Sequence, residues 1–522
     1  MSVGSLGSVR QVKLDVGFHN SICKQKSSRH GIVSKIAAQS SSQKLYLGLD
    51  FGTSGARAIC IDEVGDVVHD TRTGYHNSEL PWHHTWERAL HDLLQQTPAH
   101  RRACIAAIAV AATTTTSLLI NRDNGEVLAD TILYSQPQDE SITAAAQAIV
   151  PEDHSAGASV SSLCKLLFWH QQRAWQKARD EGGDPGLLHH ADWLASLLHG
   201  RRTCSDWHNA ARLGFDAAAG AYPAWLLAQD FADVLPRDVL QPGCAVAQTL
   251  PHLTQKWGLP PSCTVHAGTT DSVAAFLAAG VEQAGEAVSS LGSTLAIDLL
   301  STCPIDTAKY GICSYRWKDQ WIIDGGSNTG GAVLRQFFST DQLQTLSKQI
   351  EASVSSGLDY YPLLGQGQRF PVNDPNMLPR MTPRPESDAH FLHGLLEGIA
   401  RIERESYDLL TKLGATPVSK VYTAGGGAAS QVWNDIRQQM LGVPVVKSLA
   451  AEAAYGAALL ASQKNSANAG KGSLLPEENM HVCKPQCSDA DVGQHQNQSI
   501  SQQLEMSAGS NYCKMVLRIR YA

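Results

Sequence analysis

The chain has 522 residues, of which 43% are hydrophobic and 17% charged, and its formal net charge is −7. This length leaves room for two large domains, each with its own core. The negative charge argues against nucleic acid as a partner, and no apolar run reaches the roughly 18–20 residues that span a bilayer, so no membrane partner is expected. The twelve cysteines are scattered without the spacing of a zinc site, which favours reduced thiols.

The first 43 residues differ in composition from the rest. They hold six lysines and arginines against the single acid Asp15, are rich in serine and lack a long apolar stretch. This composition predicts a transit peptide, and with it a location in the chloroplast stroma ahead of the cytoplasm. A disordered leader is the alternative. At the other end, residues 463–522 are polar and weakly periodic, which predicts a disordered tail.

Residues 45–61 have the pattern of two apolar strands joined by a turn that contains glycine and hydroxyl side chains. Asp50 ends the first strand, and the turn runs through Gly52, Thr53, Ser54 and Gly55. Exposed backbone N–H groups and hydroxyls in such a turn bind anions, and a neighbouring carboxylate can hold a cation or a substrate hydroxyl. The segment therefore predicts a site for phosphate and a metal ion.

Beyond this hairpin, strand and helix patterns alternate, which is typical of a mixed α/β sheet. A helix is expected at 86–94, and a buried strand at 105–110 leads to the hydroxyl cluster Thr113–Ser117. Residues 135–265 are helical and rich in loops. Trp86 is interpreted as a core residue rather than a sugar contact. The histidine pairs 83–84 and 189–190 lack metal spacing and are expected at the surface.

Asp271 stands immediately before a short apolar helix that ends near Gly280. One interpretation is an N-cap, in which the carboxylate accepts hydrogen bonds from free N–H groups at the start of the helix. The other is a general base, which takes a proton from a hydroxyl as that hydroxyl attacks a phosphate. Both remain open on the residues alone.

The phosphate-binding pattern occurs a second time, at Gly292, Ser293 and Thr294, again between two apolar strands. Further on, a long amphipathic helix is expected over 393–413, with a solvated face that carries His393, Glu397, Arg401, Glu403 and Arg404. The segment 421–441 has the pattern strand, triple glycine, helix, which is a nucleotide-contact geometry. No Walker-type loop Gly-x-x-x-x-Gly-Lys-Ser/Thr exists in the chain.

Together, the segments 47–58, 268–280, 289–297, 325–338, 422–444 and 452–458 resemble the FGGY carbohydrate kinases. The chain resembles the plant and cyanobacterial pentulose kinases more closely, and the run 369–376 is part of that likeness. The resemblance implies an α/β fold of two ribonuclease-H-like domains, as in actin and hexokinase, with an interdomain cleft that closes over ATP and sugar. The domains would span 44–270 on the sugar side and 271–462 on the ATP side.

The resemblance also implies residue roles. Asp271 would be the catalytic base, and Asp50 and Asp271 would hold Mg²⁺, directly or through water. Substrate contacts would come from Asp50, Thr53, Ser54, Gly55, Thr113 and Asp271. Contacts to ATP would come from Gly52, Thr53, Gly292, Ser293, Thr294, Gly331, Gly425, Gly426, Gly427 and Asn434.

The expected activity is ATP-dependent phosphorylation of a ketopentose, D-ribulose to D-ribulose 5-phosphate. A D-xylulose kinase, a polyol kinase and a non-catalytic ATP-binding sensor or scaffold are the alternatives. Two segments depart from the family pattern: Thr113–Ser117 replaces a Gly-Gln-x-His-Gly loop, and residues 134–138 replace Trp-Asn-Asp-x-Arg. Both lie on the sugar side, so the ATP assignment is the firmer one. The sequence predicts no oligomeric state.

Overall fold

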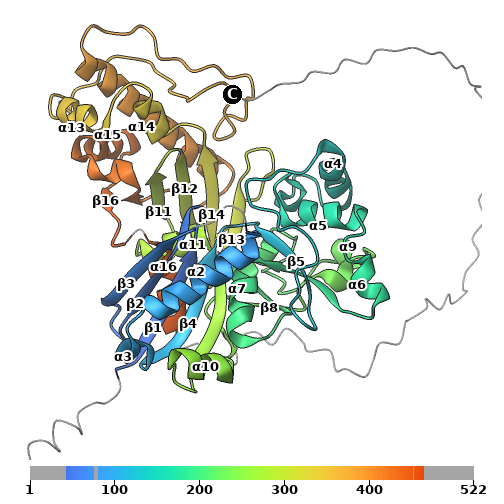
Figure 1. Ribbon diagram of the computed structural model, residues 1–522. Helices are drawn as coiled ribbons and strands as arrows, with labels where there is room; N and C mark the ends of the chain where they lie inside the picture. The colour runs from blue at the N-terminus through green and yellow to red at the C-terminus, as the bar shows by residue number, and fades with distance from the viewer. Residues whose placement is uncertain (1–42, 76–79, 451, 464–522) are drawn as a thin grey trace, which may run out of the picture. The chain divides into compact units, whose positions relative to one another are not determined.

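The computed structural model describes residues 43–75, 80–450 and 452–463. The expected transit peptide and most of the expected tail lie outside these residues. Two six-stranded mixed sheets form the framework (Figure 1). The first has the order β3-β2-β1-β4-β10-β9, and its strands are β1 Leu45–Phe51, β2 Gly55–Ile61, β3 Val67–Gly74, β4 Ile105–Ala112, β9 Ala245–Gln248 and β10 Thr264–Thr270.

The second sheet has the order β13-β14-β12-β11-β15-β16. Its strands are β11 Glu286–Leu291, β12 Leu295–Ser301, β13 Cys313–Trp317, β14 Gln320–Ser327, β15 Lys420–Ala424 and β16 Val445–Lys447. In both sheets three antiparallel strands, β1-β2-β3 and β11-β12-β14, are extended beyond the first of them by parallel strands, β4 and β10 in one sheet and β15 and β16 in the other. The strands β9 and β13 add to the edges in antiparallel orientation. This shared topology confirms the expected α/β class with two related domains.

Helices and two small sheets complete the described part. The small sheets pair β5 Ser117–Asn121 with β6 Pro185–His189, and β7 Cys204–Asp206 with β8 Asp238–Leu240. The helices of the first half are α2 Trp82–Gln96, α3 Ala99–Arg102, α4 Glu140–Ile149, α5 Ser162–Gln171, α6 Gln176–Asp180, α7 His190–His199, α8 Trp207–Ala211, α9 Ala224–Leu227 and α10 Pro251–Trp257. Those of the second half are α11 Asp271–Ala278, α12 Gly331–Arg335, α13 Thr340–Ser347, α14 Asp388–Lys412, α15 Gln431–Leu441 and α16 Ala453–Ser462.

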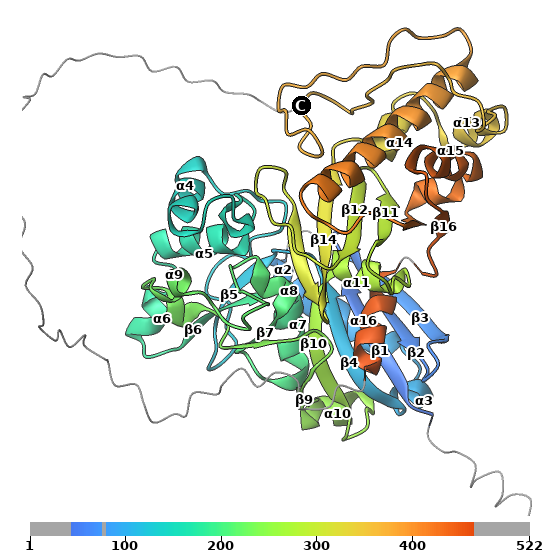
Figure 2. The same ribbon diagram turned by 180° about the vertical axis from the view of Figure 1, so that it is seen from behind.

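The first sheet is covered on both faces because its central strands are apolar on both. Leu47 and Leu49 of β1 pack with Trp86 and Leu93 of α2, which lies in front of the sheet in Figure 1. The opposite face packs against α16, which lies in front in the reverse view (Figure 2). Trp86 is 2% exposed, so its assignment to the core is confirmed.

Glycine at position 48 allows α16 to approach β1 closely. A Cβ there would lie 1.9 Å from the carbonyl oxygen of Ala454, and backbone atoms cannot move aside as a side chain can. We expect Gly48→Ala to lower the free energy of unfolding by about 1–3 kcal/mol, measured by denaturant titration. Gly365→Ala is the control, because a Cβ at Gly365 meets no atom within 4 Å. Equal effects of the two substitutions would contradict this explanation.

Two predictions of surface exposure are wrong. His189 and His190 are 0% and 1% exposed, because they join β6 to α7 inside the first domain. On α14, His393, Glu397 and Glu403 are 8%, 6% and 0% exposed, whereas Arg401 is half-buried and Arg404 is exposed as predicted. The helix is covered on more than its apolar stripe, because α15 and the strands of the second sheet pack against the face that carries Glu403.

Candidate active site

Sheet register brings the two acids of the first domain to one edge. Asp50 of β1 pairs with Ala111 of β4, and Ala111 pairs with Thr269 of β10, two residues before Asp271. The three strands are parallel, so their carboxyl ends meet at the same edge. The turn after β1, the hydroxyl cluster after β4 and the start of α11 therefore lie together, although more than 200 residues separate them in the sequence.

The turn after β1 is closed by its own backbone and by two tyrosines. The N–H of Gly52 donates to the carbonyl oxygen of Gly55 at 3.1 Å, and the hydroxyl of Tyr75 donates to the carbonyl oxygen of Gly52 at 3.0 Å. The hydroxyls of Thr53 and Tyr134 are 3.1 Å apart. Thr53 and Ser54 are exposed, so both hydroxyls can meet a ligand. Tyr134 belongs to the segment that departs from the family pattern, and the structure places it at this turn.

Asp50 carries a carboxylate oxygen with no protein partner. Its Oδ1 is buried and forms no hydrogen bond. Burial, followed by the charges of Asp271 and Glu452, raises the pKa of Asp50 to about 7, against the lowering effect of Arg57. Arg57 forms ion pairs with Asp70 and Glu452 instead. A buried, unpartnered oxygen beside a second carboxylate is a fitting position for a cation or a substrate hydroxyl.

The raised pKa of Asp50 implies a cost in stability. The pKa of this carboxyl is near 4 in the unfolded chain and about 7 in the folded protein. The folded protein therefore loses stability as the pH rises from about 4 through about 7. We expect Asp50→Asn to raise the free energy of unfolding at pH 8 by about 1–4 kcal/mol, and by much less at pH 4.5. Denaturant titrations at the two pH values measure this. Asp319→Asn, at an exposed position, is the control, and a gain that is equal at both pH values would contradict the explanation.

Asp271 is the first residue of α11, and Thr270 is the cap. The hydroxyl of Thr270 accepts the N–H of Val273, so the N-cap interpretation of Asp271 is wrong. Oδ1 of Asp271 accepts the hydroxyl of Thr114 at 3.2 Å and the N–H of Ser272 at 3.0 Å. Burial raises the pKa of Asp271, while these hydrogen bonds lower it. The carboxylate is thus oriented by two donors and is a better proton acceptor than an exposed aspartate.

The hydroxyl cluster after β4 is held by hydrogen bonds among its own members and to a buried histidine. The hydroxyl of Thr113 is 2.8 Å from that of Thr116 and 3.0 Å from Nδ1 of His190. The His190 ring lies against Trp86, with centroids 3.7 Å apart. Nε2 of His190 and Nε1 of Trp86 are buried without a hydrogen-bond partner. Thr113 itself is 6% exposed, so its hydroxyl mainly fixes the cluster.

In the second domain, the glycine-rich segments converge on the end of β11. The carbonyl oxygen of Gly292 accepts the N–H of Gly331 at 3.0 Å, and that of Ser293 accepts the N–H of Ala332 at 3.0 Å. A Cβ on Gly425 would lie 2.8 Å from the carbonyl oxygen of Leu291, and the φ of Gly425 is +77°, which glycine adopts without strain.

The remaining predicted residues of this domain extend the same surface. The hydroxyl of Ser293 accepts a hydrogen bond from Arg335 at 2.9 Å, and Gly292 and Thr294 close their turn with an N–H···O bond of 3.1 Å. A Cβ on Gly427 would touch Leu291, whereas one on Gly426 would meet nothing. The amide of Asn434 donates to the carbonyl oxygen of Ala428 at 3.0 Å, so this side chain supports the glycine segment.

Sequence reasoning missed Asp324. It lies on β14 opposite Asp298 of β12, Asp298 is buried and Asp324 half-buried, and desolvation raises the pKa of each. The charge of Asp324 also raises the pKa of Asp271. Its position directly before the segment 325–338, which resembles the family, was the available signal.

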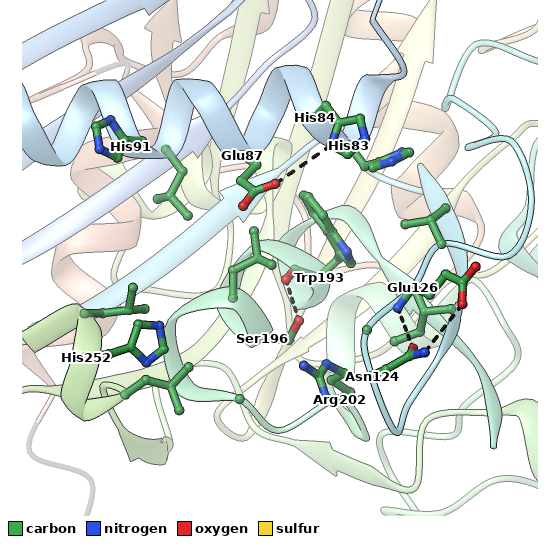
Figure 3. Close-up of a pocket in the computed structure, with 18 of the residues that line it drawn as sticks. His83, His84, Glu87, His91, Asn124, Glu126, Trp193, Ser196, Arg202 and His252 are labelled. Carbon is green, nitrogen blue, oxygen red and sulfur yellow. Dashed lines mark hydrogen bonds and ion pairs between the residues drawn. The ribbon is translucent and has the colours of Figure 1, made fainter. Parts of the chain in front are cut away.

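A cavity of about 620 Å³ is lined by residues of α2, α7 and α10 and of the segment 124–127 (Figure 3). Its wall includes His84 and Glu87 of α2, which are 4.0 Å apart, together with Trp193, Arg202 and His252. None of the predicted substrate or ATP residues lines it. Within residues 43–75, 80–450 and 452–463, no group of three or more His, Cys, Asp or Glu side chains is arranged to hold a metal ion. In the same ranges, no helix has the length and apolar character of a membrane span.

Two family models match the chain. The N-terminal domain of the FGGY family of carbohydrate kinases matches residues 45–278, and the C-terminal domain of the same family matches residues 299–463. Because the two models cover nearly all described residues in the right order, they agree with the two sheets of the actin-like fold.

Individual relatives carry different substrate names. A xylulose kinase of Bacillus subtilis is 28% identical over 44% of this chain, and the match spans only 48% of that kinase. A gluconokinase of the same organism is 22% identical over 77% of this chain and 83% of its own length. The crystal structure of Plasmodium falciparum glycerol kinase with ADP superposes with a TM-score of 0.70 at 16% identity, over 80% of this chain and 89% of that one. That likeness is one of fold.

Proposed function

Because the chain belongs to the FGGY family of carbohydrate kinases, we propose that it transfers the γ-phosphoryl group of ATP to the terminal hydroxyl of a ketopentose. The proposed reaction is D-ribulose to D-ribulose 5-phosphate. The observation that carries the proposal is the pair Asp50 and Asp271, which share one sheet edge next to the exposed hydroxyls of Thr53 and Ser54.

In this proposal Asp271 removes the proton from the attacking hydroxyl. Its hydrogen bonds from Thr114 and Ser272 fix the carboxylate, and its raised pKa lets it hold that proton during transfer. Phosphoryl transfer needs positioning and charge neutralisation more than covalent catalysis. The N–H groups and hydroxyls at Gly52–Ser54 and Gly292–Thr294 would contact the phosphates, and Gly331, Gly425–Gly427 and Asn434 would border the adenosine.

Mg²⁺ fits the residues present. Mg²⁺ is commonly held in such sites by one or two carboxylates together with water and substrate phosphates, and Asp50 offers a buried oxygen without a partner. Asp50 and Asp271 would hold the ion, directly or through water. When bound, the ion would neutralise negative charge on the transferred phosphoryl group.

The choice of sugar rests on the closer resemblance to plant and cyanobacterial pentulose kinases. The relatives named above differ in acceptor, so family membership alone leaves a D-xylulose kinase or a polyol kinase as alternatives. A panel of D-ribulose, D-xylulose, gluconate, glycerol and pentitols with Mg-ATP, followed by ADP release, tests this. The highest kcat/KM is expected with D-ribulose. ATP binding without ADP release on any acceptor would favour a nucleotide sensor or scaffold.

Localisation in the chloroplast stroma is a further part of the proposal. It rests on the basic, serine-rich composition of residues 1–43, which hold one acid. A fusion of these residues to a fluorescent protein is expected to enter plastids. A purely cytosolic signal would contradict the assignment.

A further inference from the structure

The hydroxyl cluster beside Asp271 contains a strained residue. Thr115 has a φ of +63°, in the left-handed region that β-branched residues rarely occupy. Such a conformation persists only where the surroundings hold it. The strained residue follows Thr114, whose hydroxyl donates to Asp271 at 3.2 Å. The strained residue therefore lies directly beside the hydroxyl that contacts Asp271.

A buried lysine holds this residue. Lys165, on α5, is 0% exposed, and its Nζ donates to the carbonyl oxygen of Thr115 at 2.7 Å and lies 3.3 Å from its Oγ1. The same carbonyl accepts the hydroxyl of Ser117 at 2.9 Å. Because two donors hold the carbonyl oxygen of Thr115, the peptide bond after this residue is fixed in the orientation that goes with the left-handed conformation.

The lysine is unusual because no acid compensates its charge. Among the ion pairs of the described residues, none includes Lys165. Burial, and then the charge of Arg212, lowers the pKa of Lys165 to about 7, and only Cys164 opposes this. A buried ammonium without a carboxylate is an expensive way to stabilise a fold. The hydrogen bonds that Lys165 does form are those of its Nζ with the carbonyl oxygen and the hydroxyl of Thr115.

We propose that Lys165 is a positioning residue for phosphoryl transfer, which holds Thr115 in the left-handed conformation and thereby keeps the Thr114 hydroxyl on Asp271. The inference rests on the proposed function, since it assumes that Asp271 acts as the base. Lys165 touches neither the base nor the expected substrate, and its effect passes through the backbone of residues 114–115. The lysine lies 50 residues away in sequence and on a different element, so the assignment depends on tertiary structure.

The test is a rescue experiment with purified full-length protein and the acceptor that wild type phosphorylates best. Lys165→Met keeps the length of the side chain and removes the donor. It is expected to lower kcat by about 10–100-fold, the size of effect that a small misplacement of a reacting group produces, with the KM for ATP unchanged. Lys177→Met is the control, because Lys177 is 87% exposed on α6.

Adding Thr115→Gly to Lys165→Met should restore most of the lost kcat, because glycine adopts positive φ without a holding contact. Thr115→Gly alone should stay within about threefold of wild type, since the lysine still fixes the peptide. A rescue of this kind would not follow if Lys165 acted through its charge.

The outcomes separate the two claims. If wild type and Lys165→Met share the same kcat while Asp271→Asn is inactive, the kinase stands and the role of Lys165 is refuted. If Thr115→Gly does not restore the kcat of Lys165→Met, Lys165 does not act through the backbone conformation of Thr115. If Lys165→Met does not fold, the double variant decides, because it must fold and turn over if the inference is correct. No turnover by wild type on any acceptor overturns both claims.

Discussion

Asp271→Asn is expected to lower kcat for sugar phosphorylation by about three orders of magnitude, within the usual range for loss of a general base. Asparagine keeps the shape of the side chain and can still accept the hydrogen bonds from Thr114 and Ser272. It cannot take a proton from the attacking hydroxyl. The affinity for ATP should change little, because most of the predicted ATP contacts lie in the second domain, after β11, at α12 and between β15 and α15, and Gly52 and Thr53 keep their own backbone and hydroxyl groups. Steady-state ADP release and direct titration of ATP measure the two quantities.

A matched substitution at Asp324 tests the electrostatic part of this account. The charge of Asp324 contributes to the raised pKa of Asp271, although burial is the main cause. Asp324→Asn should therefore lower the pKa of Asp271 and move the acid limb of kcat/KM to lower pH. It should leave turnover near its optimum, since Asp324 has no role in proton transfer here. A kcat for Asp271→Asn within tenfold of wild type would exclude Asp271 as the base.

Much of the fold could be predicted because its signals are local. The hairpin at 45–61 combines alternating apolar residues with a glycine turn, and the structure places β1 and β2 at these positions. The helix expected at 431–441 matches α15 at both ends, because Ser430 caps its start and Gly442 ends it in a left-handed conformation. The rule that parallel strands meet at one edge then brings Asp50 and Asp271 together once the strand order is known.

The interpretations that failed depended on partners far away in the sequence. Glu403 has the spacing of a solvated residue on a helix, but Arg437 and Ser289 surround it from two other elements. His189 was predicted at the surface because it lacks the spacing of a metal ligand, whereas its Nδ1 forms hydrogen bonds with Asp192 and Ser205 inside the domain. Periodicity reports which face of a helix is apolar. It carries no information on a buried polar group that is satisfied by another segment.

Arg437→Met is expected to lower the free energy of unfolding by about 3–5 kcal/mol, because it leaves the carboxylate of Glu403 buried without its counter-charge. Both side chains are 0% exposed. The guanidinium contacts both carboxylate oxygens of Glu403 at 2.7 Å and donates to the hydroxyl of Thr423 at 2.6 Å. Denaturant titration measures the change. Arg404→Met, which removes an exposed arginine 3.7 Å from Asp408, is the control and should cost less than about 1 kcal/mol.

The same ion pair links stability to the expected ATP site. Glu403 accepts the hydroxyl of Ser289 at 2.5 Å, and Ser289 lies on β11, three residues before Gly292. Thr423 lies on β15, two residues before Gly425. Arg437→Met should therefore also raise the KM for ATP, because Thr423 of β15 loses its hydrogen bond and Glu403, which accepts from Ser289 of β11, loses the guanidinium that holds it.

The double variant Glu403→Leu with Arg437→Met separates charge from packing. Removal of both charges leaves no unpaired ion, so most of the lost stability should return. The KM for ATP should stay raised, because Thr423 still lacks Arg437 and Ser289 has now lost Glu403, with only the hydroxyl of Tyr407 left to it. If Arg437→Met proves no more destabilising than Arg404→Met, the carboxylate of Glu403 is not held as a buried ion. The proposed link between this ion pair and the glycine turns would then also be wrong.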